Sequence, residues 1–382
     1  MKCARFWDLV IGIFLDQLDQ LEITFSLKAV HVKYKVIGLM SGTSLDGLDI
    51  AFCEFKKDGK NWSYHILCAE TIPYSEEWRN RLANLEKGSG HDFATTDIDF
   101  GHLSGKLTTN FINKHQIQPD FIASHGHTIF HQPEKRITWQ IGKGSSIAAE
   151  TGLPVVCDFR SLDVALGGQG APLVPMGDRL LFSGFDFCLN LGGFANISYE
   201  QDGQRIAYDI CPVNVVLNHL AGRIGKSFDP SGQMARIGNL SPSLLLSLNQ
   251  LAYYNHPPPK SLGKEWVLSH IFPILDRSSV LLNDQLNTFC EHIAIQISKA
   301  SFRNENLKML ITGGGAFNEY LLERIVHHTP HIIIQPDNNT INFKEALIFA
   351  FLGVLRWRQE INCLQSVTGA SQDNIGGAIY FI

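Results

Sequence analysis

Short apolar runs alternate with glycine-rich turns at two places in the chain. At the first, VIGLM (36–40) is followed by the turn SGTSLDG and then by LDIAFCEF (48–55). At the second, FCLNL (187–191) is followed by GGFAN and then by ISYE. An apolar run, a glycine turn and a second run are typical of a β-hairpin. The two predicted hairpins begin about 150 residues apart, which indicates one copy of a similar unit in each of two domains.

Outside these hairpins, helical periodicity alternates with short apolar runs. One segment is well punctuated: Ser145 or Ser146 is placed to cap a helix, Gly152 to end it, and VVCDF (155–159) to follow as a strand. Comparable patterns predict helices at 99–115, 286–302 and 321–329 and strands at 121–126, 308–312 and 331–335. This alternation predicts an α/β protein with partly parallel sheets. The Gly/Pro-rich stretches 166–175 and 255–264 are typical of linkers.

Composition narrows the class of protein. A chain of 382 residues that is 45% hydrophobic is long enough for two domains. Its net charge of −5 and lack of a basic stripe argue against nucleic acid as a partner. The eight cysteines lie far apart and form no CxxC motif, which favours a reducing, cytoplasmic compartment over a zinc site or a disulfide framework. Residues 1–33 contain an apolar stretch too short to span a membrane and are interpreted as an N-terminal extension; no other segment is expected to cross a membrane.

The first glycine turn carries candidate chemistry. The loop from Ser41 to Asp49 combines two glycines, which allow close approach to the backbone, with hydroxyl groups on Thr43 and Ser44. Backbone N–H groups and hydroxyls are the donors that bind phosphate. Asp46 and Asp49 add carboxylates that can hold Mg²⁺ directly or through water. The loop therefore predicts a phosphate site, and an ordinary hairpin turn is the alternative.

Two further glycine turns fit the same picture. They are LGGFAN (191–196) and TGGGAFN (312–318), and the second connects a predicted strand to a predicted helix. A glycine-rich turn that leads into a helix N-terminus can bind an anion, although many such turns exist for packing alone. Together with the Ser41–Asp49 loop, they predict a nucleotide cleft lined from both domains.

Six motifs occur in a fixed order: SGTSLDGLDIA, SHGHT (124–128), DFRSLDVALGGQGAPLVP (158–175), LNLGGFANIS, ITGGGAFN and the terminal VTGA (367–370). This set resembles the anhydro-N-acetylmuramic acid kinase family, over residues 36–382. The resemblance implies a fold of the sugar kinase/actin/Hsp70 type, with two ribonuclease-H-like domains around an ATP cleft. We expect 34–155 plus 363–382 to form domain I and 156–362 to form domain II.

The resemblance also implies an activity. Members of this family open the 1,6-anhydro ring of anhydro-N-acetylmuramic acid with water at C1 and transfer the γ-phosphoryl group of ATP to O6. The product, N-acetylmuramic acid 6-phosphate, belongs to peptidoglycan recycling. The expected cofactors are ATP and Mg²⁺, and the expected partner is a small-molecule sugar, with neither nucleic acid nor membrane. A homodimer is one option for the assembly.

Residue roles follow from matching the motifs. Asp209 in YDICPVN is the expected catalytic base, with Asp158 and Asp163 as rival carboxylates. His125, Thr128, Arg160 and Glu345 are the expected sugar contacts, and Lys260 and Glu265 match a family segment without an assigned role. The expected nucleotide site comprises Gly42, Thr43, Ser44, Leu45, Asp46, Gly47, Leu48, Asp49, Gly192, Gly193, Gly313, Gly314 and Gly315, with Asp46 as the expected link to Mg²⁺ through water.

The sequence departs from the family pattern near the expected sugar and base. The departures are His127, Cys211, Val213, Asn218 and Ser231, and the larger side chains at 211 and 213 either narrow the site or repack it. Three alternatives stay open at this point. The chain could be a related kinase for another amino or anhydro sugar, a non-catalytic homologue, or a metal-dependent hydrolase. The hydrolase alternative uses His125, His127 and His131, because positions 125 and 127 of a strand share a face.

Overall fold

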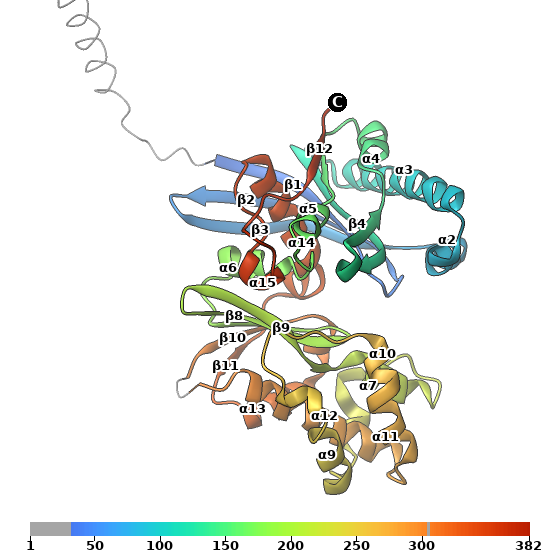
Figure 1. Cartoon of the computed structure of the whole chain (residues 1–382), viewed down its shortest axis with the longest axis vertical. Coiled ribbons are helices and arrows are strands. Elements are labelled where there is room, and N and C mark those ends of the chain that lie inside the picture. Colours follow the sequence, from blue (N-terminus) through green and yellow to red (C-terminus); the bar gives the residue numbers. More distant parts are fainter. Residues whose placement is uncertain (1–31, 304–305) are drawn as a thin grey trace, which may run out of the picture.

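The computed structural model describes residues 32–303 and 306–382. The predicted N-terminal extension therefore lies outside the described residues, except for Val32 and Lys33, which begin the first strand. Two sheets organise the described part of the chain, one above the other in Figure 1. We call the upper one sheet A and the lower one sheet B.

Sheet A has seven strands in the order β12-β6-β4-β1-β2-β3, with β5 paired to β4. Its strands are β1 (Val32–Ser41), β2 (Gly47–Asp58), β3 (Asn61–Pro73), β4 (Phe121–Gln132), β5 (Ile137–Ile141), β6 (Val155–Cys157) and β12 (Ala378–Tyr380). Strands β1, β4 and β6 run parallel, whereas β1, β2 and β3 are antiparallel neighbours. Because β12 pairs with β6, the C-terminal segment closes this sheet.

Sheet B has five strands in the order β11-β10-β7-β8-β9. They are β7 (Phe187–Leu191), β8 (Phe194–Gln201), β9 (Gln204–Pro212), β10 (Lys308–Thr312) and β11 (Ile332–Ile334). Strands β7, β8 and β9 are antiparallel, and β7, β10 and β11 are parallel. This is the order of β1, β2, β3, β4 and β6 in sheet A, so the two predicted hairpins are confirmed as the first strands of a repeated ribonuclease-H-like unit.

Helices cover the sheets on both sides. They are α2 (Glu76–Asn84), α3 (Gly90–His115), α4 (Gly144–Thr151), α5 (Ser161–Ala165), α6 (Val174–Leu181), α7 (Asn214–Gly222), α8 (Gln233–Arg236), α9 (Pro242–Asn249), α10 (Lys264–Trp266), α11 (Phe272–Arg277), α12 (Leu282–Ala300), α13 (Glu319–His328), α14 (Asn338–Trp357) and α15 (Gln365–Thr368). Short 3-10 turns lie at Leu85–Lys87, Pro133–Lys135, Pro230–Gly232, Ala252–Asn255 (η4) and Gly314–Phe317 (η6), and a π-helical turn at Val267–Ile271 joins α10 to α11. None of the helices in the described ranges is long and apolar enough to cross a membrane.

Helix α4 shows one correction to the sequence prediction. The helix begins at Gly144, with Lys143 as its N-cap and no side-chain cap, so the expected cap by Ser145 or Ser146 is wrong. Gly144 packs so closely against Cys157 and Tyr380 that a β-carbon would lie 2.5 Å from the Cys157 Sγ. Packing against β6 and β12 therefore sets this helix start. The predicted end is confirmed, because Gly152 adopts a left-handed φ of 66° at the C-cap.

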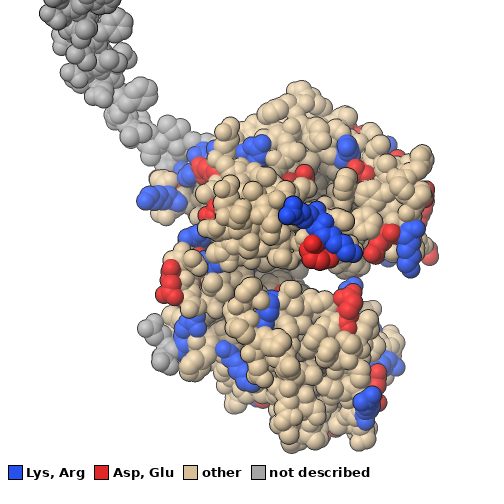
Figure 2. All heavy atoms as spheres, in the orientation of Figure 1, with Lys and Arg blue, Asp and Glu red and all other residues tan. Residues whose placement is uncertain are grey.

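The two sheets share a core through helix α14. This helix packs on β1, β2 and β4 of sheet A and also contacts β10 of sheet B. Its buried cluster includes Cys188 and Leu310 from sheet B. The predicted division between 34–155 plus 363–382 and 156–362 stays a prediction, and it assigns α14 to domain II although the helix lies mainly on sheet A. Figure 2 shows a hollow between the upper and lower bodies that opens on the right.

Candidate active site

The β1–β2 turn presents polar groups at its surface. Thr43, Ser44 and Asp46 are exposed, and Leu45 adopts a left-handed φ of 61° that bends the chain back. In Figure 1 this turn descends from sheet A toward the lower body. Gly47 and Leu48 are the first residues of β2 and are buried, so they fix the position where the turn rejoins sheet A. The Thr71 hydroxyl donates to Asp49 at 2.5 Å, and burial raises the pKa of Asp49.

The glycine turns of sheet B lie against one another. A β-carbon on Gly313 would lie 2.6 Å from the Asn190 Oδ1 and 2.9 Å from the Leu191 backbone, and φ at Gly313 is 82°. The N–H groups of Val213 and Val215 both donate to the Gly193 carbonyl, at 2.8 and 3.3 Å, which fixes the start of α7 beside the β7–β8 turn. A β-carbon on Gly193 would meet no atom within 4 Å. This backbone therefore borders open space, as a nucleotide cradle requires.

Three of the expected sugar contacts lie together at the edge of sheet A. Arg160 donates to the His125 Nε2 through Nε at 3.0 Å and through Nη2 at 2.9 Å, and to the Gly170 carbonyl at 2.6 Å. Glu345 interacts electrostatically with both Arg160 and Asp49, and burial raises its pKa. Its side chain nevertheless retains solvent access, as expected for a group on the floor of a cleft. These contacts connect the β1–β2 hairpin to α14 and to the residues after β6.

The protonation states in this cluster follow from burial. Burial, reinforced by the positive charge of Arg160, holds the pKa of His125 well below its usual range. His125 is therefore neutral, with its Nδ1–H donating to the Gly126 carbonyl at 2.9 Å and Nε2 accepting from Arg160. Burial lowers the pKa of Arg160 to about 10, which still leaves the guanidinium charged at neutral pH. The cluster thus offers one cation and one carboxylate to a polar ligand.

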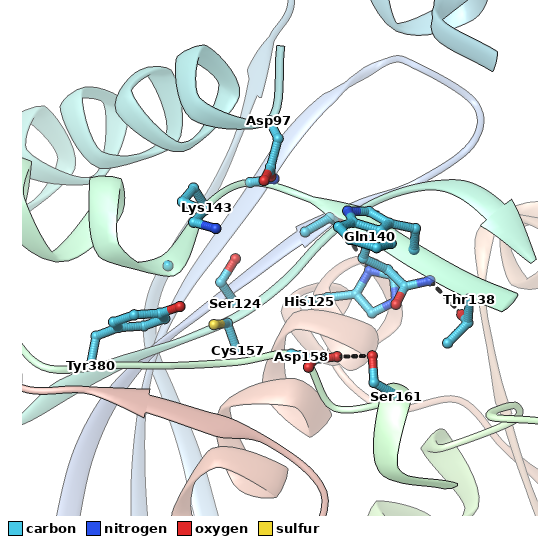
Figure 3. A pocket seen from close by; sticks show the side chains of 14 residues that line it. Asp97, Ser124, His125, Thr138, Gln140, Lys143, Cys157, Asp158, Ser161 and Tyr380 are labelled. Atoms are coloured by element: carbon cyan, nitrogen blue, oxygen red, sulfur yellow. Dashed lines mark hydrogen bonds between the residues drawn. The ribbon is translucent and has the colours of Figure 1, made fainter. Parts of the chain in front are cut away.

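A pocket of about 180 Å³ adjoins this cluster, between Ser124–Gly126 of β4 and the carboxyl end of β6 at Cys157. Figure 3 shows Ser124 and Cys157 beside each other there, with Lys143 and Tyr380 on one side and His125 on the other. Asp158 lines the pocket in a left-handed conformation (φ 58°) and accepts from the Ser161 hydroxyl. Ligands of α/β sheets bind outside the carboxyl ends of the strands. The fourth expected sugar contact, Thr128, lies farther along β4, where it pairs with Gln140.

The expectation that His125 and His127 share a face is wrong. His125 packs on Phe349 of α14, whereas His127 contacts Phe100 of α3 and accepts from or donates to the Ser41 hydroxyl at 2.9 Å. The alternation of the strand is interrupted at Gly126, where φ is 77° and the register with β1 shifts. His131 contacts Thr138 instead. The described residues contain no group of three or more potential metal ligands, so the hydrolase alternative loses its ligand set.

Asp209, the expected base, lies near the end of β9. The Leu262 N–H donates to its Oδ2 at 2.9 Å, and its own N–H donates to the Lys260 carbonyl at 3.2 Å. The side chain is half-buried, and burial raises its pKa. Among the described residues, no other group is recorded as donating to this carboxylate, which leaves Oδ1 available to a water molecule.

The rival carboxylate Asp163 has a structural role. It is fully buried and accepts hydrogen bonds from the Gly170 N–H (2.7 Å), the Thr368 hydroxyl (2.8 Å), the Asn374 amide (2.9 Å) and the Cys363 thiol (3.0 Å). These donors come from two distant segments, so Asp163 fastens the C-terminal part of the chain to the loop after α5. Both carboxylate oxygens are therefore occupied by protein donors, which leaves Asp163 without a site for an attacking water.

The departures from the family pattern lie mostly away from the open surface. Cys211 and Val213 are both fully buried in the core of sheet B, so these side chains repack the interior and do not narrow the site. Asn218 is exposed on α7. Ser231 lies in a left-handed turn (φ 52°) next to Asp229, whose carboxylate caps the start of α8 by accepting from Met234 and Ala235.

Several contacts around the site have no signature in the motifs. Asn214 at the start of α7 donates to the Leu191 carbonyl, beside the glycine turns. The Thr312 hydroxyl, directly before Gly313, is buried and finds no hydrogen-bond partner among the residues that the structure describes. The stretch 255–264 was expected to be a linker, and this expectation is wrong because Lys260 and Leu262 both bond to Asp209 within the sheet B body. The sequence feature that points to this contact is the single lysine after three prolines, in PPPKSLG.

Two ribonuclease-H-like sheets, each with a glycine turn between its first two strands, define the class of actin-like ATPases and sugar kinases, which confirms the expected fold class. Comparison with known proteins is more specific. The family model for anhydro-N-acetylmuramic acid kinase matches residues 34–382, and the chain belongs to this family.

Curated relatives match over almost their whole length. The chain is 34% identical over 364 residues to the anhydro-N-acetylmuramic acid kinase of Sulfurovum sp. (strain NBC37-1), covering 91% of this chain and 99% of that protein. It is 34% identical over 375 residues to the enzyme of the same name from Aliivibrio fischeri, again covering 91% and 99%. A solved ROK family glucokinase from Streptomyces griseus, in complex with glucose and AMPPNP, shares 12% identity over 83% of this chain and 98% of that chain, with a TM-score of 0.37.

Proposed function

We propose that this protein is an ATP-dependent kinase that opens 1,6-anhydro-N-acetylmuramic acid with water and phosphorylates O6. The product is N-acetylmuramic acid 6-phosphate, an intermediate of peptidoglycan recycling. Family membership over residues 34–382 supports this substrate. The observation that carries the mechanism is the Asp209 carboxylate, which is half-buried and held at Oδ2 by the Leu262 N–H, with no donor to Oδ1 in the described part of the chain.

Asp209 acts as the general base. Its Oδ1 takes a proton from a water molecule as the water oxygen bonds to C1 of the sugar. The C1–O6 bond breaks, and O6 receives the phosphoryl group that ATP supplies. Because burial raises the pKa of Asp209, its ionised form is a stronger base than an exposed aspartate.

The other residues bind and orient. Arg160 and Glu345 offer a cation and a carboxylate to the hydroxyl, amide and carboxylate groups of the sugar, and His125 orients the Arg160 guanidinium. The exposed hydroxyls of Thr43 and Ser44 and the open backbone at Gly193 fit the phosphates of a nucleotide. Closure of the hollow between the two bodies would exclude bulk water from the reacting atoms.

The β1–β2 turn can supply only some of the oxygen ligands of Mg²⁺, and the phosphates of the nucleotide would supply others. Asp46 is exposed at this turn, and Asp49 follows it at the start of β2. These carboxylates would hold Mg²⁺ directly or through water, and phosphate oxygens of the nucleotide would supply further ligands. We assign Asp46 to this role, through water. We also propose a cytoplasmic location, supported by the free thiols of the seven cysteines in the described residues.

The test is a product assay. Purified protein is incubated with 1,6-anhydro-N-acetylmuramic acid, Mg²⁺ and ATP, and the sugar 6-phosphate is measured by mass spectrometry. Asp209→Asn should abolish the product while ATP affinity changes by less than about twofold. Asp202→Asn is the matched control, because Asp202 lies exposed in the β8–β9 turn of the same hairpin. Phosphorylation of a different amino sugar and not this one would identify a related kinase, and retained turnover in Asp209→Asn would remove Asp209 from the role of base.

A further inference from the structure

A short strap, residues Lys260–Leu262, lies beside the edge strand β9. It follows three prolines and precedes α10, and it has no regular secondary structure of its own. The Lys260 carbonyl accepts the Asp209 N–H at 3.2 Å, and the Leu262 N–H donates to the Asp209 Oδ2 at 2.9 Å. The strap therefore holds both the main chain and the carboxylate of one residue. Without helix or sheet bonds, its position depends on side-chain anchors.

Lys260 provides the anchor. Its ammonium donates to the Tyr253 carbonyl at 3.2 Å and lies 4.7 Å from the Tyr253 ring centroid and 5.7 Å from that of Tyr208. An ammonium between two aromatic faces is attracted by both ring quadrupoles. The Tyr253 hydroxyl in turn donates to the Asp209 carbonyl at 2.6 Å. Tyr253 thus connects the anchor of the strap to the same aspartate that the strap holds.

The charges around Asp209 are few. Cys211 on β9 and Tyr253 on η4 interact electrostatically with its carboxylate. Burial raises the pKa of both groups, so both are neutral at physiological pH. The Lys260 ammonium lies over the two tyrosine rings, and no bond between it and the Asp209 carboxylate is found in the described residues. Burial lowers the pKa of this ammonium. The Leu262 N–H is consequently the main group in the described protein that stabilises the ionised carboxylate, against the opposing effect of burial.

We propose that Lys260 is a positioning residue for Asp209, acting through the Leu262 N–H, which turns the carboxylate so that Oδ1 faces the attacking water. The proposal rests on the proposed function, because it assumes that Asp209 is the base. Loss of the anchor frees the strap, removes the hydrogen bond to Oδ2 and disfavours the ionised form of the carboxylate. As the pH is lowered, the variant should therefore lose the activity that needs an ionised Asp209 at a higher pH than the wild type.

The experiment measures the pH dependence of kcat for sugar phosphorylation in the full-length protein. In Lys260→Met, which keeps the length of the side chain and removes its charge, we expect the acid limb to move up by roughly half a pH unit or more. The KM for ATP should stay within about twofold. Lys260→Arg keeps a cation between the rings and should retain the wild-type limb. Lys264→Met, an exposed lysine at the start of α10, is the matched control.

An unchanged acid limb in folded Lys260→Met overturns the proposal. Where Lys260→Met fails to fold, Lys260→Gln takes its place: it removes the charge that the two tyrosine rings attract and keeps a polar end, and an unmoved limb there is equally contrary. Failure of the proposed function is distinguishable, because turnover retained by Asp209→Asn shows that the base is elsewhere. An inactive Asp209→Asn together with a wild-type limb in Lys260→Met overturns only the role of the strap.

Discussion

Arg160 donates twice to the Nε2 of His125, at 3.0 and 2.9 Å, and once more to the Gly170 carbonyl at 2.6 Å. The imidazole is neutral and uses its other nitrogen on the Gly126 carbonyl. This fork fixes the tautomer of His125 and the orientation of the guanidinium at the same time. It also connects β4 to the loops that follow β6, at the edge of the pocket.

Arg160→Lys should impair sugar binding and not nucleotide binding. A lysine ammonium cannot reproduce the fork to His125 and Gly170. Loss of one charged hydrogen bond corresponds to roughly a 10- to 100-fold decrease in kcat/KM for the sugar. Steady-state kinetics with each substrate varied in turn measure this, and the KM for ATP should change less than about twofold. Arg179→Lys, which alters a surface pair with Glu200, is the control. An effect confined to ATP would contradict the assignment.

Gly193→Ala should weaken ATP binding without loss of stability. Within residues 32–303 and 306–382, a β-carbon at this position meets no atom within 4 Å, so we expect the substitution to act on a bound ligand. We expect the KM for ATP to rise roughly tenfold, since a methyl group would occupy the space where phosphates approach the backbone. Gly184→Ala is the control, because that glycine also has no atom within 4 Å and lies in the exposed turn before β7. Equal nucleotide affinity in both variants, by calorimetry, would remove the β7–β8 turn from the nucleotide site.

Asp163→Ala should destabilise the fold. The substitution leaves buried donors from Gly170, Thr368 and Asn374 without their acceptor. The expected loss in the free energy of unfolding is about 3–5 kcal/mol, measured by urea denaturation. Asp276→Ala, which breaks an exposed pair with Arg223, should cost at most about 1 kcal/mol. A stable but inactive Asp163→Ala would instead favour Asp163 as the base.

Acid should destabilise the protein partly through His292. This side chain is fully buried, bonded to Asn249 and Tyr254, and burial lowers its pKa to about 3. The unfolded chain binds this proton below pH ~6.5, whereas the folded protein does not bind it until near pH 3. Stability from this group is therefore complete above pH ~6.5 and falls by about 1.4 kcal/mol per pH unit below it.

The variant His292→Gln tests this assignment. It should be less stable than the wild type at pH 7.5, because one of the two hydrogen bonds is lost. Between pH 6.5 and 4.5, its free energy of unfolding should decrease less steeply than that of the wild type, by about 1.4 kcal/mol per pH unit. Urea denaturation at several pH values gives both quantities. Parallel slopes for the two proteins would assign the acid sensitivity to other groups, among them His127, whose pKa burial lowers to about 4.

The hairpins and the α/β alternation could be predicted from the sequence because they depend on local patterns. Apolar runs around a glycine turn specify β1 and β2, and Gly152 ends α4 through its own left-handed conformation. The reversal at Gly126 could not be predicted in the same way. It depends on the register between β4 and β1, which are about 80 residues apart in the chain.

The surroundings of Asp209 were hidden for a related reason. Its partners are backbone atoms of Lys260 and Leu262, and backbone groups are the same for every residue type. A Pro-rich stretch is typical of a linker, and nothing local indicates that Lys260 inserts between two tyrosine rings. Asp163 illustrates the converse. The sequence offers it as a rival base, whereas three of its four donors come from residues about 200 positions away.

The central claim is that water opens the sugar ring while ATP provides only the phosphoryl group. It is tested most directly by a single-turnover reaction in ¹⁸O-enriched water, quenched before the C1 hydroxyl exchanges with solvent and analysed by mass spectrometry. The account predicts sugar 6-phosphate with one ¹⁸O at C1 and none in the phosphate, and no label after Asp209→Asn because no product forms. Label in inorganic phosphate, with the anhydro sugar recovered intact, would contradict it.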